Sequence, residues 1–111
     1  MRFIFKRKVP AYTPSPGDIL AMELLARGWS QRQFAKILGK PIQAVHEIMH
    51  AKKRITPETA LRIAAALGTS PDLWIDLETD YRLSLARRVI AQELLDEIAS
   101  RSAKLQLETS A

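Results

Sequence analysis

The sequence predicts an all-α fold of five or six short helices, for three reasons. Turn signals divide the 111-residue chain at short, regular intervals. Between these signals, apolar residues recur with the period of a helix. Strand-like alternation does not extend over five or more residues anywhere in the chain. Apolar residues make up 47% of the sequence, which is enough for one compact core, and the length predicts one domain with tails.

The composition excludes several classes of protein. The chain has no cysteine, which excludes a disulfide scaffold, a thiolate metal site and a cysteine nucleophile. No apolar run approaches the roughly 18 residues that a membrane span needs. The segment MRFIFKRKVP has only a three-residue apolar stretch before its basic cluster, so it does not match a secretory signal. We therefore expect a cytoplasmic protein without a membrane partner.

The first helix is expected to begin at Pro16. Ser15 can cap this helix, Pro16 suits the first helical position, and Asp18 places a negative charge in the first turn. Gly28 is expected to end it. The apolar residues that follow with helical spacing are Ile19, Leu20, Leu24 and Leu25.

The second and third helices are separated by a very short turn. Ser30 and Gln33 form a capping box that predicts the start of the second helix. Gly39 ends it, because glycine adopts a left-handed backbone at no steric cost, and Pro41 restarts the helix. The predicted buried face of the second helix is Phe34, Ala35, Ile37 and Leu38. The third helix is marked by Ile42, Val45, Ile48 and Met49.

Two further helices follow, and a capping residue followed by a proline predicts the start of each. Thr56-Pro57-Glu58 and Ser70-Pro71-Asp72 predict their starts, and Gly68 ends the first of them. The apolar positions of the fourth helix are Leu61, Ala64, Ala65 and Leu67, and those of the fifth are Leu73, Trp74, Leu77 and Tyr81. A last amphipathic stretch runs through Val89, Ile90, Leu94, Leu95 and Ile98, and the tail after about Ser102 has little to bury.

The second and third helices carry the functional signal. A turn of three or four residues centred on Gly39 places two short helices steeply across each other, which is the helix-turn-helix arrangement. Ala35 is small where the helices cross, and Val45 and Ile48 anchor the third helix inward. The other face of that helix is then free to enter a DNA major groove. The candidate base-reading residues are Ile42, Gln43, His46, Glu47 and His50.

The residue types on this face suit base recognition. Gln43 can pair with adenine through two hydrogen bonds, His46 can donate to guanine or a phosphate, and Ile42 can meet a thymine methyl. A Lys-Lys-Arg run follows directly, where backbone phosphates would pass, and Gln31 stands at a helix N-terminus that favours negative charge. The candidate phosphate contacts are Gln31, Lys40, Lys52, Lys53 and Arg54.

The net charge of +5 is concentrated in two short segments. Residues 1–8 contain four Lys or Arg and no acid, residues 52–54 are all basic, and the part of the chain after residue 54 is mildly acidic. We expect a basic N-terminal arm over residues 1–13, a helix-turn-helix DNA-binding domain over 14–88, and a C-terminal helix and tail over 89–111 for dimer or partner contact. Whether the arm crosses DNA or pairs with a partner stays open.

A competing motif overlaps the third helix. His46-Glu47-Ile48-Met49-His50 matches H-E-x-x-H, the zinc-metalloprotease signature. These are the only two histidines in the chain, so a third ligand would be a distant carboxylate such as Glu58 or Glu78. No strand-edged substrate cleft is predicted either. We therefore expect neither catalysis, nor a resident metal, nor any other cofactor.

The sequence resembles the HigA-type antitoxins, within the lambda-repressor-like, Xre-type helix-turn-helix superfamily. The resemblance covers residues 14–85, and its most specific part is the segment ITPETALRIAAALGTSPDLWIDLE. Other matching runs are Pro16-Gly17-Asp18-Ile19-Leu20, Ser30-Gln31, Leu38-Gly39 and Lys52-Lys53-Arg54-Ile55-Thr56. Pro41 and Ile42 stand where Ser/Thr and Arg are frequent in the family, and Ala51 replaces a frequent glycine.

The resemblance implies a lambda-repressor-like five-helix domain with an extra C-terminal helix. It also implies a homodimer that binds double-stranded operator DNA, represses its own operon, and neutralises a HigB-type mRNA interferase by direct contact. The alternative is an Xre-type transcriptional regulator without a toxin partner. Three residues of the fifth helix are expected to serve as core or dimer contacts: Trp74, Leu77 and Tyr81.

Overall fold

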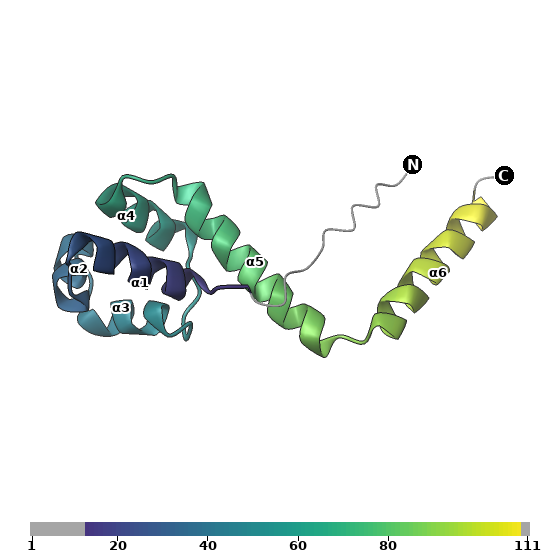
Figure 1. Cartoon of the computed structure of the whole chain (residues 1–111). Helices are drawn as coiled ribbons and strands as arrows, with labels where there is room; N and C mark the ends of the chain where they lie inside the picture. The colour runs from purple at the N-terminus through teal and green to yellow at the C-terminus, as the bar shows by residue number, and fades with distance from the viewer. Residues whose placement is uncertain (1–12, 110–111) are drawn as a thin grey trace.

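The computed structural model describes residues 13–109 and confirms the all-α prediction. Within this range the chain forms six helices and no strand: α1 (Pro16–Arg27), α2 (Gln31–Leu38), α3 (Ile42–Met49), α4 (Pro57–Leu67), α5 (Pro71–Val89) and α6 (Gln92–Thr109). Helices α1 to α4 and the start of α5 form a compact body, and α6 extends away from it (Figure 1). Apart from Thr13, the predicted basic arm lies outside the described residues.

The predicted helix caps are confirmed. The Ser15 side chain accepts the Asp18 backbone N–H at 3.2 Å, while the Asp18 carboxylate accepts the Ser15 N–H at 3.1 Å. Ser30 and Gln33 make the same reciprocal pair at the start of α2. Thr56 and Ser70 cap α4 and α5. Each cap satisfies backbone donors that the first turn of a helix otherwise leaves without partners.

The core lies where α1 to α5 meet. Its largest fully buried side chains are Trp74, Phe34, Leu20, Ile63 and Val45. The indole of Trp74 is completely buried, and its Nε1 donates to the Thr69 hydroxyl at 2.8 Å. Of the three predicted core or dimer residues, Trp74 is therefore a core residue, and Leu77 packs against the core. Tyr81 is partly exposed.

Three positions that were predicted to be buried are exposed: Ile37 in α2, and Leu61 and Ala65 in α4. Leu25 and Leu73, which only follow the helical spacing of apolar residues, are exposed as well. In α4, Ala64 and Leu67 are buried as predicted, and Ala60 and Ile63 complete the buried stripe. These residues follow the i, i+3, i+4, i+7 spacing of one helix face. Helix α4 contains more apolar residues than its buried face has positions, so Leu61 and Ala65 face the solvent.

The C-terminal part differs from the prediction in two ways. The amphipathic stretch from Val89 to Ile98 is not continuous, because α5 ends at Val89 and Ile90 has an extended backbone (φ −84°, ψ 132°). Beyond Ser102, where the sequence offers little to bury, α6 nevertheless continues to Thr109. No residue of α6 is buried. No helix within residues 13–109 combines the length and apolarity that crossing a membrane requires.

Candidate nucleic-acid interface

The turn between α2 and α3 spans only residues 39–41. Gly39 has a left-handed backbone (φ 69°), which a side-chain-bearing residue adopts only at a cost. Its N–H donates to the Lys36 carbonyl at 3.1 Å, and the Lys40 N–H donates to the Ala35 carbonyl at 3.0 Å. Pro41 is the N-cap residue of α3 and makes no side-chain cap hydrogen bond. The predicted helix-turn-helix joint is therefore present.

One face of helix α3 is apolar and packs into the core, and the opposite face is accessible to solvent. Val45 and Ile48 are buried, as predicted. On the outer face, Ile42, Gln43 and His50 are exposed, while His46 and Glu47 are half-buried. The five candidate base-reading residues thus lie on the accessible side of α3. Contact between these residues and bases remains a prediction.

Gly17 sets the distance between α1 and α3. A Cβ atom added at Gly17 would lie 2.4 Å from the carbonyl oxygen of Met49 and 2.6 Å from that of Ile48. These are backbone atoms, so a side chain at residue 17 would push the two helices apart. The sequence shows Gly17 in the family motif, but its contact with the end of α3 is visible only in the fold.

The basic segment 52–54 forms a loop of defined shape. Ala51 has a left-handed backbone (φ 56°), which accounts physically for the glycine that is frequent at this position in the family. The N–H groups of Lys52 and Lys53 both donate to the Glu47 carbonyl, at 2.8 and 3.2 Å. The side chains of Lys52, Lys53 and Arg54 are exposed and form no ion pair within the described residues.

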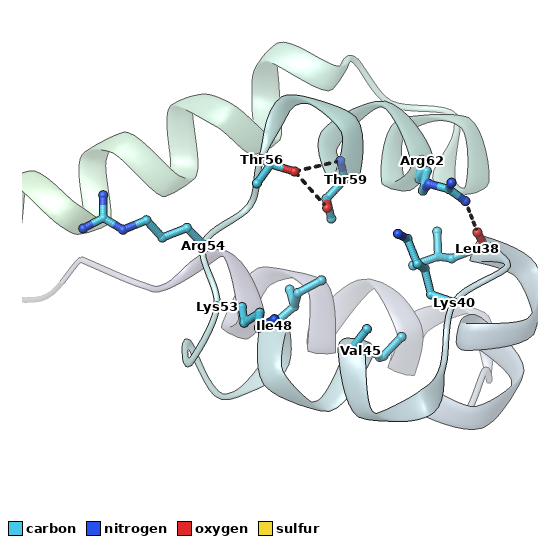
Figure 2. Close-up of a pocket in the computed structure, with 10 residues that line it drawn as sticks. Leu38, Lys40, Val45, Ile48, Lys53, Arg54, Thr56, Thr59 and Arg62 are labelled. Carbon is cyan, nitrogen blue, oxygen red and sulfur yellow. Dashed lines mark hydrogen bonds between the residues drawn. The ribbon is translucent and has the colours of Figure 1, made fainter.

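A cavity of about 200 Å³ lies between α3 and α4, beside this loop (Figure 2). Its floor is apolar, made by Leu38, Val45 and Ile48. Other lining residues carry cationic or hydroxyl groups: Lys40, Lys53, Thr56, Thr59 and Arg62. Arg54 also lines the cavity, but its guanidinium points away from it (Figure 2). Three predicted phosphate contacts therefore line the same cavity as two side chains of α4, Thr59 and Arg62, which sequence analysis did not single out.

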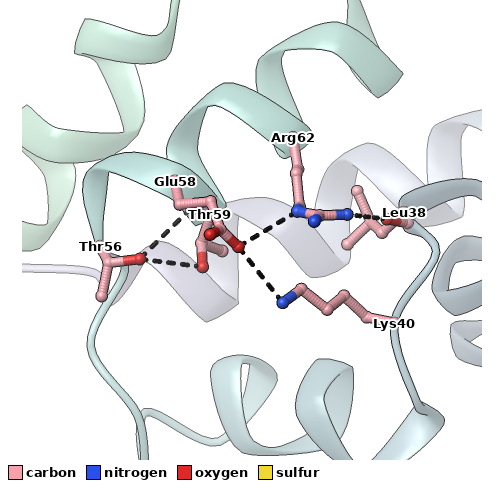
Figure 3. Close-up of polar contacts among 6 residues, drawn as sticks. All are labelled: Leu38, Lys40, Thr56, Glu58, Thr59 and Arg62. Atoms are coloured by element: carbon pink, nitrogen blue, oxygen red, sulfur yellow. Dashed lines mark hydrogen bonds and ion pairs between the residues drawn. The ribbon is translucent and has the colours of Figure 1, made fainter.

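Lys40 is paired with an acid in this structure. Oε1 of Glu58 lies 3.3 Å from Nζ of Lys40 and 3.3 Å from Nε of Arg62 (Figure 3). Nη1 of Arg62 donates to the Leu38 carbonyl at 2.8 Å. The hydrogen bond and charge of Lys40, reinforced by Arg62, hold the pKa of Glu58 below its ordinary value. A phosphate must therefore compete with Glu58 for Lys40.

Gln31 is the first residue of α2 and is partly exposed. It follows directly on the Ser30 cap, where the backbone N–H groups of the first turn point outward. This position suits the predicted phosphate contact. The partial positive charge of the helix N-terminus favours an anion at the same place.

The two histidines of the H-E-x-x-H segment are neighbours. The rings of His46 and His50 are 4.1 Å apart between centroids, and Nδ1 of His50 lies 2.9 Å from the His46 carbonyl. Over residues 13–109, no group of three or more His, Cys, Asp or Glu side chains is placed to hold a metal ion. The two distant carboxylates considered as a third ligand, Glu58 and Glu78, are engaged elsewhere.

Glu78 is a residue whose role sequence analysis missed. It is only 8% exposed, and its Oε1 accepts the backbone N–H of Ile55 at 2.8 Å. Its other oxygen pairs with Arg82, one helical turn further along α5. One signal was available: Trp74, Glu78 and Arg82 follow each other at four-residue spacing, so Glu78 shares a helix face with the most buried tryptophan.

The short turn between α2 and α3, the exposed outer face of α3 and the exposed basic loop after it are the features of a helix-turn-helix DNA-binding protein. Residues 20–74 match the family described as Helix-turn-helix. Virulence-associated protein I of Dichelobacter nodosus is 33% identical over 84 residues, which is 75% of this chain and 76% of that protein. These matches agree with the fold.

Solved structures identify the family. An addiction module antidote protein of the HigA family from Coxiella burnetii has 32% identity and a TM-score of 0.64, over 87% of this chain and 94% of that one. The Pseudomonas aeruginosa antitoxin HigA, solved with the higBA promoter, has 28% identity and a TM-score of 0.65, over 68% of this chain and 83% of that one. The chain belongs to the HigA family of helix-turn-helix antitoxins.

Proposed function

We propose that the protein is a dimeric, sequence-specific repressor of its own operon, and that it neutralises a HigB-type mRNA interferase by binding it directly. The observation that carries the DNA-binding part is the placement of α3, whose inner face is anchored by Val45 and Ile48 and whose outer face is free. The basic loop directly after α3, whose Lys and Arg side chains are exposed, supplies charge for the DNA backbone. The proposed place of action is the cytoplasm.

The proposed DNA contacts divide into two groups. Base edges are read by Ile42, Gln43, His46, Glu47 and His50, and backbone phosphates are bound by Gln31, Lys40, Lys52, Lys53 and Arg54. Phosphate contacts set affinity and register, whereas contacts to base edges give specificity. Gln43 is the most informative of these residues because it is exposed and an amide can make two hydrogen bonds to adenine.

The experiment is a binding measurement with DNA from the promoter of the protein's own operon. Binding should be salt-sensitive. Gln43→Ala should reduce discrimination at one base position by roughly 1–3 kcal/mol. Gln106→Ala, which removes an exposed glutamine from α6, is the matched control and should leave discrimination unchanged. Equal affinity for promoter and unrelated DNA would refute the specific-repressor proposal.

The homodimer is supported by the C-terminal helices. Most helical stability in proteins comes from tertiary packing, yet no residue of the 18-residue helix α6 is buried. Exposed apolar side chains continue from the end of α5 into α6: Leu83, Val89, Ile90, Leu94, Leu95, Ile98 and Leu105. We therefore propose that a second copy covers these side chains. A helix-turn-helix dimer reads an inverted repeat whose half-sites are about 34 Å apart along the DNA.

The dimer is tested by light scattering. Ile98→Asp should shift the mass toward the monomer, because a charge on the apolar face must be desolvated at an interface. Ser100→Asp introduces the same charge on the opposite face of α6 and should leave the mass unchanged. A monomeric wild-type protein at all concentrations would contradict the dimer.

The toxin partner is tested separately, since the alternative function is an Xre-type transcriptional regulator without a toxin. Co-expression with a small basic protein encoded just upstream should relieve growth arrest caused by that protein, and the two should co-purify. If that neighbouring gene is missing, or if its product is harmless, the alternative is favoured. Neither outcome changes the DNA-binding proposal.

A further inference from the structure

Glu78 is a buried carboxylate that the proposed DNA contacts do not use. Its exposure is 8%, and carboxylates are rarely buried unless they are paired. Here both oxygens are used: Oε1 accepts the Ile55 N–H at 2.8 Å, and Oε2 forms the ion pair with Arg82. Arg82 lies on the same helix as Glu78, whereas Ile55 lies 23 residues away in the chain.

Ile55 is the anchor of the basic loop. Its side chain is buried in the core, and it directly follows Lys52, Lys53 and Arg54. The loop is therefore held at both ends. The Glu47 carbonyl accepts two N–H groups at the α3 end, and Glu78 accepts one at the α4 end. Between these points the three basic side chains are exposed.

We infer that Glu78 is a positioning residue for DNA binding: it holds the basic loop against α5, in register with α3. Without an acceptor, the Ile55 N–H would be buried and unpaired, so the loop would move to reach water. The three basic side chains would then lose conformational entropy each time DNA binds, and this loss would weaken the affinity for DNA. This inference rests on the proposed function.

The test compares Glu78→Met with Glu78→Gln in the full chain. Methionine keeps the length of the side chain but removes the acceptor, whereas the glutamine carbonyl still accepts the Ile55 N–H. Affinity for the promoter DNA is measured over a salt series. Each phosphate contact contributes a slope of about −0.9 to log K against log salt, so loss of about two contacts in Glu78→Met should reduce the slope by nearly 2. Glu78→Gln should retain the wild-type slope.

Two controls separate positioning from general destabilisation. Arg82→Ala removes the ion pair but leaves the Ile55 hydrogen bond, so the salt slope should be retained. Ile63→Val weakens the buried face of α4 without removing a hydrogen bond of the loop, so it should also retain the slope. If Glu78→Met does not fold, Glu78→Ala takes its place. A wild-type slope in the methionine or alanine variant, or equal losses in the methionine and glutamine variants, would overturn the inference.

Amide exchange in the absence of DNA completes the test. The Ile55 amide should exchange faster in Glu78→Met than in the wild type and stay protected in Glu78→Gln. If the wild-type protein does not prefer its promoter, the proposed function fails, while exchange still reports whether Glu78 holds the loop. If exchange accelerates but affinity and salt slope are unchanged, the proposed function stands and the inference about Glu78 fails.

Discussion

Nζ of Lys40 lies 3.3 Å from Oε1 of Glu58, which ties the turn between α2 and α3 to the first turn of α4. Arg62 extends this connection, since it contacts the same carboxylate oxygen and the Leu38 carbonyl (Figure 3). The Glu58 side chain is largely exposed, and exposed ion pairs contribute little to stability. The main consequence of the Lys40–Glu58 ion pair concerns DNA binding, because Glu58 neutralises a lysine that is proposed to bind a phosphate.

Replacing Glu58 by glutamine should therefore strengthen DNA binding. Lys40 would no longer be neutralised, so promoter affinity should rise and the salt slope should steepen by about one phosphate contact. The measurement is binding over a salt series. Glu108→Gln, which makes the same change of charge on α6, is the control and should have a smaller effect. A weaker complex for Glu58→Gln would show that the carboxylate supports DNA binding by holding the turn.

The Glu58 carboxyl should titrate at a low pH in the folded protein. Lys40 and then Arg62 favour its ionised form, which lowers its pKa. Because the folded-state pKa is depressed, the stabilisation is present above the unfolded-state pKa and is lost as the pH falls through the folded-state pKa. An NMR titration should show the midpoint rising in Lys40→Ala. An unchanged midpoint would contradict the ion pair in solution.

Removing the buried indole should severely destabilise the fold. Trp74 is fully buried and hydrogen-bonded to Thr69, so Trp74→Ala should cost roughly 3–5 kcal/mol in the free energy of unfolding. Leu25→Ala removes an 82% exposed side chain from α1 and should change stability by no more than about 0.5 kcal/mol. Urea denaturation measures both. Similar losses for the two variants would contradict the assignment of the core.

A methyl group at residue 17 should disturb both stability and DNA binding. In Gly17→Ala the new atom would collide with the backbone carbonyl of Met49, and such overpacking typically costs roughly 1–3 kcal/mol. Because Met49 is the last residue of α3, promoter affinity should fall as well. Gly28→Ala is the control: its left-handed backbone makes it unfavourable, but no atom lies within 4 Å of the new Cβ. Gly28→Ala should therefore lower the free energy of unfolding, but the folded variant should bind the promoter with the affinity of the wild type.

Zinc should not bind stoichiometrically. His46 and His50 lie side by side, but no third metal-ligating side chain joins them within residues 13–109. Metal analysis of untagged protein should find well below one zinc per chain. One tightly bound zinc per chain, lost in His50→Ala, would contradict the assignment of this helix to DNA reading.

Sequence alone determined where α1, α2, α4 and α5 begin and where the helix-turn-helix lies. Caps act between residues three or fewer apart, as in the pairs Ser15–Asp18 and Ser30–Gln33, so their partners can be read directly from the chain. The outer face of α3 was predictable for the same reason, since a helix has a known period. The exposure of Ile37 and Leu61 was not predictable from the sequence, because an apolar residue in a helix can be buried but need not be.

The tertiary structure alone decided which helices meet and what their meeting does to individual side chains. Met49 limits residue 17 to glycine, Glu58 holds Lys40, and Glu78 is buried against Ile55. Each pair joins residues that are far apart in sequence, and carboxylates such as Glu58 and Glu78 look alike in the sequence. Their environments differ only after the helices have packed: one remains in solvent beside two cations, and the other is enclosed with a backbone donor. Packing therefore decided how the basic loop and the turn before α3 are held.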